Sequence, residues 1–176
     1  MKKVLFSLIA LMAVMTVQAQ SICGSWQLMQ PLVQNEGDGY VMMTYIHTFN
    51  NDGTFYSDAD VTYSSEPAKT KAREVALSGT VKGTYTLEGD QLKMYPNINT
   101  FNLEIVNLSE NGKVLKDRDA LEAANKALNQ TAKVEMAKQW TDDTYTVKLT
   151  ANDQMLELTG EDGEVDRLMR IATIKH

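Results

Sequence analysis

The chain has 176 residues, 43% of them hydrophobic, with 17 Lys and Arg against 23 Asp and Glu. This length can bury the core of one domain, and the acidic balance argues against nucleic acid or an anionic lipid surface as a partner. The single cysteine, Cys23, excludes an internal disulfide, so packing must hold the fold.

The first residues have the pattern of a secretory signal peptide. Lys2 and Lys3 precede the apolar run Val4–Val17, and Ala19 offers a small residue at the cleavage position. The run is short for a transmembrane span, although a retained anchor is the alternative. We therefore predict a signal peptide over residues 1–19 and a mature domain over 20–176, periplasmic or secreted, with no integral membrane span. Removing Lys2 and Lys3 leaves 15 basic against 23 acidic side chains, a formal charge of −8.

Two hairpins are the strongest local signal in the mature chain. Each joins two runs of alternating apolar and polar residues through a turn that contains glycine, which is typical of antiparallel strands. The runs are Tyr40–Phe49 and Thr54–Tyr63 around Asn50–Gly53, and Gly79–Leu87 and Gln91–Tyr95 around Glu88–Asp90. Pro96 is expected to end the last of them.

The remaining segments add further strands and one helix. We expect strands at Ile22–Leu28, Phe101–Leu108, Thr144–Thr150, Gln154–Thr159 and Glu164–Ile174, with loops at Gln30–Gly39 and Ser64–Val75. Asp117–Trp140 lacks Gly and Pro, and its apolar residues recur about every four positions, which predicts an amphipathic helix capped by Asp117 or Asp119. The sequence therefore predicts a mainly β protein: an antiparallel up-and-down barrel of eight or nine strands with one long helix.

Four motifs in this order resemble those of the lipocalin-like (calycin) domains exported by Bacteroidetes. They are Gly24-Ser25-Trp26, Phe49–Phe55, Gly83-Thr84-Tyr85 with Gly89–Leu92, and Leu168–Ile171. The resemblance covers nearly all of the mature chain and implies a barrel of the kind that carries small apolar molecules. It also implies that Trp26 closes one end of the barrel with Arg170 over its ring. The long helix departs from the typical position before the last strand, so it could lie on the barrel wall or act as a lid.

Alternate residues of a strand share one face of the sheet, and this strand parity predicts which side chains face the interior. Inward aromatic, methionine and histidine side chains suit a small-ligand site, although phenols that bond each other in a filled core are the alternative. The predicted ligand-binding residues are Met43, Tyr45, His47, Phe55, Tyr85 and Tyr145. His47 and Cys23 make no metal set or nucleophile pair, so we predict no catalytic residue, metal or cofactor. We interpret the acidic groups Asp58/Asp60 and Glu161/Asp162/Glu164/Asp166 as solvated turn charges rather than calcium ligands.

Two functions compete on these observations. The first is an exported, non-enzymatic protein that binds a small, largely apolar ligand inside the barrel. The second is a structural or protein-interaction module of the cell envelope with a filled barrel and an unidentified protein partner. An enzyme is the weakest hypothesis, because no nucleophile and base, and no metal ligands, are spaced for chemistry.

Overall fold

The computed structural model describes residues 22–36, 39–65, 73–114, 116–139 and 143–172. The predicted signal peptide, residues 1–19, lies outside these ranges and stays a prediction, as does the inclusion of Trp140 in the helix. Within the described ranges, no helix is both long and apolar enough to cross a membrane.

Antiparallel strands account for most of the described chain, and one long helix, α2, interrupts them. The strands are β1 (Gly24–Leu28), β2 (Leu32–Glu36), β3 (Gly39–Phe49), β4 (Thr54–Ser65), β5 (Arg73–Glu88), β6 (Gln91–Glu110), β7 (Lys113–Val114), β8 (Asp143–Thr150), β9 (Met155–Thr159) and β10 (Val165–Ile171), and α2 spans Arg118–Gln139.

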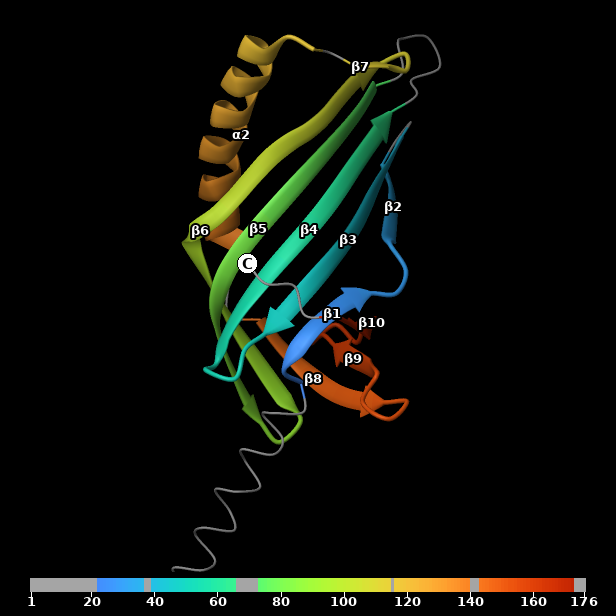
Figure 1. Cartoon of the computed structure of the whole chain (residues 1–176), viewed down its shortest axis with the longest axis vertical. Coiled ribbons are helices and arrows are strands. Elements are labelled where there is room, and N and C mark those ends of the chain that lie inside the picture. Colours follow the sequence, from blue (N-terminus) through green and yellow to red (C-terminus); the bar gives the residue numbers. More distant parts are fainter. Residues whose placement is uncertain (1–21, 37–38, 66–72, 115, 140–142, 173–176) are drawn as a thin grey trace, which may run out of the picture.

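The strands form a single sheet that closes on itself (Figure 1). The pairing order runs β1-β10-β9-β8-β6-β5-β4-β3, and β3 then pairs with β1 to complete the ring. β1 and β2 share one edge of β3, because β1 pairs with residues 46–49 and β2 with residues 39–43. The predicted antiparallel barrel with one helix is confirmed; among the described residues eight strands make the ring, and β2 and β7 lie beside it.

The two predicted loops have wrong bounds. The segment predicted as a loop over Gln30–Gly39 contains β2, which begins just after Pro31, at the strand start where proline is tolerated. The loop expected at Ser64–Val75 has wrong bounds at both ends, because β4 continues to Ser65 and β5 starts at Arg73, and residues 66–72 lie outside the described ranges.

Pro96 does not end its strand, so the two strands predicted around it are one, β6. Pro96 pairs with Gly83 just beyond Met94, where the ladder between β6 and β8 stops. The register against β5 then shifts between Thr80 and Lys82. There the Thr100 hydroxyl takes the place of a β6 backbone group as the hydrogen-bond partner of Lys82. It accepts the Lys82 N–H at 2.9 Å and donates to the Lys82 carbonyl at 3.1 Å. A bulge of this kind bends a strand without ending it.

The helix α2 lies along the edge of β6 that β8 leaves uncovered (Figure 1). Asp117 caps it by accepting the Ala120 N–H at 3.1 Å. Two asparagines then bond the strand edge: Asn125 Oδ1 accepts the Ile105 N–H at 2.6 Å, and Asn129 Oδ1 accepts the Leu103 N–H at 2.9 Å. The Asn129 amide also donates to the Leu103 carbonyl. The helix therefore extends the barrel wall, which settles the choice between wall and lid for its described residues.

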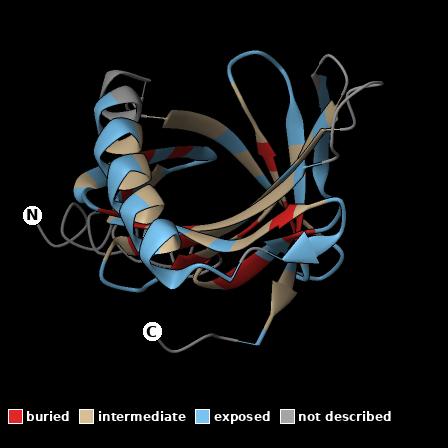
Figure 2. Ribbon diagram, turned by 90° about the horizontal axis from the view of Figure 1, so that it is seen from above, coloured by how far each residue is buried: buried red, intermediate tan, exposed pale blue. Residues whose placement is uncertain are grey.

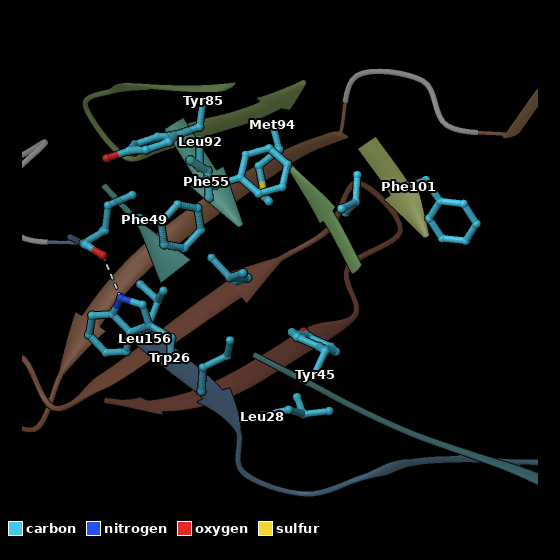
Figure 3. Packing of buried hydrophobic residues seen from close by; sticks show 14 residues of the cluster. Trp26, Leu28, Tyr45, Phe49, Phe55, Tyr85, Leu92, Met94, Phe101 and Leu156 are labelled. Carbon is cyan, nitrogen blue, oxygen red and sulfur yellow. Dashed lines mark hydrogen bonds between the residues drawn. The ribbon is translucent and has the colours of Figure 1, made fainter. Parts of the chain in front are cut away.

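The buried core fills one end of the barrel. Figure 2 shows the buried positions on the strands around the ring, whereas no described side chain of α2 is fully buried. The close-up in Figure 3 shows Trp26, Phe49 and Leu156 gathered together, with Tyr45 and Phe101 farther along the interior. The most fully buried side chains are Trp26, Phe49, Ile22, Leu92, Leu156, Leu158, Leu168 and Ser25.

Candidate functional site

Beyond this core the barrel holds a cavity of about 500 Å³ that is partly open to solvent. Its wall is mostly apolar and combines side chains from β2, β3, β4, β5, β6, β8 and β10. The lining residues are Leu32, Met43, Tyr45, His47, Phe55, Ser57, Ala59, Val61, Leu77, Gly79, Thr80, Val81, Met94, Pro96, Phe101, Leu103, Asp143, Tyr145 and Asp166. This part of the interior is therefore not filled by side chains.

Five of the six predicted ligand-binding residues meet in this cavity: Met43, Tyr45, His47, Phe55 and Tyr145. Antiparallel pairing explains why, since opposite residues share a face: the register pairs Met43 with Val61, Tyr45 with Ala59 and His47 with Ser57. That these side chains bind a ligand stays a prediction.

The sixth predicted residue, Tyr85, is not part of the cavity wall. Its ring packs edge-on against Phe49, with ring centroids 5.0 Å apart, at the filled end of the barrel (Figure 3). Its hydroxyl donates to the Asn50 carbonyl at 2.8 Å and lies 3.5 Å from the Cys23 sulfur. Tyr85 therefore ties the β3–β4 turn to the core.

Asp166 is a cavity residue that the sequence analysis placed wrongly. The interpretation as a solvated turn charge is wrong, because its Oδ2 accepts the hydroxyl of Tyr45, from the second strand along the ring, and it lines the cavity. Burial, together with this bond to Asp166, raises the pKa of Tyr45. Strand parity could have found Asp166, because it is two residues from the buried Leu168 on β10.

Asp143 is a second carboxylate in the cavity, and the sequence analysis left it out. It has the same parity on β8 as Tyr145, which also lines the cavity. Burial raises the pKa of Tyr145 to about 12, and the charges of Asp143, Asp166 and Asp162 add to the effect. Tyr145 therefore stays a neutral phenol with carboxylates near it.

A smaller pocket of about 410 Å³ adjoins the cavity and shares Leu32, Asp143, Tyr145 and Asp166 with it. The turn between β9 and β10 supplies its other acidic residues, Glu161, Asp162 and Glu164. Carboxylates therefore continue from the cavity wall into this pocket.

His47 is neutral inside the cavity wall. Its Nδ1 lies 2.6 Å from the Ser57 hydroxyl, and its ring centroid lies 4.6 Å from that of Tyr45. Burial lowers the pKa of His47 from 6.5 to about 4. At neutral pH the ring therefore adds a polar tip and no positive charge.

Acidification should destabilise the fold through His47. Between pH 6.5 and 4 the unfolded chain binds a proton that the folded chain does not, so the depressed pKa makes stability fall as pH falls. From pH 7 to pH 5 the loss is about 2 kcal/mol. His47→Gln should lose less over the same interval, as measured by urea unfolding at both pH values. Equal pH dependence of the two proteins would contradict the assignment.

The opposite end of the barrel is closed by Trp26 and Arg170. The guanidinium carbon of Arg170 lies 4.2 Å from the centroid of the Trp26 ring, and the Trp26 Nε1 donates to the Ile22 carbonyl at 2.7 Å. Arg170 also donates to the carbonyls of Cys23 and Asp153, each at 2.9 Å. Gly24 has φ +125° and a Cβ there would lie 3.1 Å from Arg170 Nη1, which explains the Gly-x-Trp motif.

Among the described residues, no group of three or more His, Cys, Asp or Glu side chains is placed to hold a metal ion. No family model matches the sequence, and a comparison with curated proteins finds no significant match.

Proposed function

We propose that this protein is an exported, non-enzymatic, lipocalin-like carrier that binds a small, largely apolar molecule inside its barrel. The predicted signal peptide, residues 1–19, supports export. The four motifs that resemble those of lipocalin-like domains support the lipocalin-like assignment.

One observation carries the proposal: the cavity of about 500 Å³ with a mostly apolar wall. Small-ligand sites typically have about 300–1,000 Å³, an apolar lining and a few polar groups that fix orientation. An eight-stranded ring is the size that holds one small ligand. Here the polar tips of Tyr45, His47 and Tyr145 supply the orienting groups.

Filling the cavity should abolish binding. Ala59 lines the wall between β3 and β5, so in Ala59→Phe a ring would occupy the space that a ligand needs. Binding of the neutral probe N-phenyl-1-naphthylamine, followed by its fluorescence, should be saturable in the native chain and at least about tenfold weaker in the variant.

The matched control is Thr86→Phe, which adds the same ring at an exposed position of β5. It should bind the probe as the native chain does, provided that circular dichroism shows both variants folded. No saturable binding by the native chain, or equal binding by both variants, would overturn the proposal and favour a module that acts only through its surface.

A further inference from the structure

The charged side chains in the described lining of the cavity are acidic. Among the described lining residues there are two carboxylates, Asp143 and Asp166, and no Lys or Arg. His47 adds no positive charge to this lining, because burial keeps its ring neutral at pH 7. A ligand that brought its own carboxylate into this space would meet like charges in a partly desolvated site, which is unfavourable.

The position of Asp166 is fixed rather than adaptable. The Tyr45 hydroxyl donates to one of its two oxygens, Oδ2, and Tyr45 itself is a buried residue of β3. A neutral hydroxyl orients the carboxylate without cancelling its charge. The phenol rings of Tyr45 and Tyr145 flank the same part of the cavity, and aromatic faces also attract cations.

The adjoining pocket extends the same charge outward. Glu161, Asp162 and Glu164 line it, and it shares both cavity aspartates. Carboxylates along an approach raise the local concentration of cations and lower that of anions. The described lining of this pocket also contains no Lys or Arg.

We infer that the ligand of this cavity is an apolar molecule with a cationic nitrogen, an aliphatic or aromatic amine, whose charge sits at Asp166. The apolar body lies against the wall formed by residues such as Met43, Val61 and Leu103. This inference rests on the proposed function, because it names the ligand class of the same cavity.

Three ten-carbon probes separate charge from apolar burial: decylammonium, decan-1-ol and decanoate, each measured by displacement of N-phenyl-1-naphthylamine at pH 7. In the native chain decylammonium should bind at least about tenfold more tightly than decan-1-ol, and decanoate more weakly than either. In Asp166→Asn the advantage of decylammonium over decan-1-ol should fall to about threefold or less, with the affinity for decan-1-ol unchanged.

The control Asp60→Asn removes the same charge from an exposed position of β4 and should leave the native preference intact. If Asp166→Asn does not fold, the preference of the native chain for decylammonium over decan-1-ol still decides. Equal affinity for the ammonium and the alcohol, or tighter binding of decanoate, would overturn the inference while leaving the carrier function standing. Failure of every probe would overturn the carrier function and this inference with it.

Discussion

Replacing Gly83 with alanine should lower the free energy of unfolding by about 3 kcal/mol or more. Gly83 pairs with Phe55 across β4 and β5, and the Phe55 ring lies over it. An added Cβ would lie 2.5 Å from Phe55 Cε1 and would collide with the Tyr95 carbonyl oxygen, which is backbone and cannot rotate away. Urea unfolding followed by tryptophan fluorescence measures the loss.

Gly79→Ala is the matched control on the same strand and the same face. There the nearest atom to an added Cβ is a flexible one, Leu103 Cδ1 at 3.2 Å. Its effect should stay within about 1 kcal/mol, since alanine also restricts the unfolded chain. Equal losses at both positions would show that the close approach of Phe55 and Tyr95 is not the cause.

Trp26→Ala should cost about 3–5 kcal/mol, a large share of the stability of a domain this size. Trp26 is 0% exposed and supports Phe49 and Leu156 at the closed end (Figure 3). The substitution leaves a cavity there and removes the ring beneath Arg170. The expected result is a lower midpoint in urea unfolding followed by circular dichroism.

Three further variants separate the contributions of the Trp26 side chain. Trp26→Phe keeps a ring but loses the N–H that bonds the Ile22 carbonyl, so it should cost less than alanine. A double-mutant cycle with Arg170→Ala should give a coupling of about 0.5 kcal/mol or more, as expected for side chains in contact. Arg167 is an exposed arginine on the same strand whose Nε donates to Glu157, so Arg167→Ala should show no coupling to Trp26.

Strand parity predicted the wall of the cavity because it is a local property. Alternation within β3 is enough to send Met43, Tyr45 and His47 to one face, whatever the rest of the chain does. Parity does not give height along the barrel, which depends on register between distant strands. Tyr85 has the predicted inward parity, yet the pairing of β5 puts it beside Phe49 at the filled end.

At two residues, the residue type predicts the wrong structure because contacts with distant parts of the chain determine it. The acidic neighbours of Asp166 in the turn predict a solvated charge, whereas its bond to Tyr45 comes from a strand more than a hundred positions away. Pro96 was interpreted as a strand end, whereas the ladder to β8 stops at Met94 and the Thr100 hydroxyl restores a partner for Lys82. The alternation of apolar residues predicts neither the bond between Tyr45 and Asp166 nor the continuation of β6 past Pro96.

The attachment of α2 to β6 sets a geometric requirement on the helix sequence. Four residues of a helix rise about 6 Å. Two residues of a strand advance about 6.6 Å. Asn125 and Asn129 therefore meet alternate backbone groups of β6, at Ile105 and Leu103, and their carboxamides take the place of peptide groups of an absent neighbouring strand. The interval between these two asparagines is consequently as constrained as a strand register, although both sit on a helix whose other described positions are largely exposed.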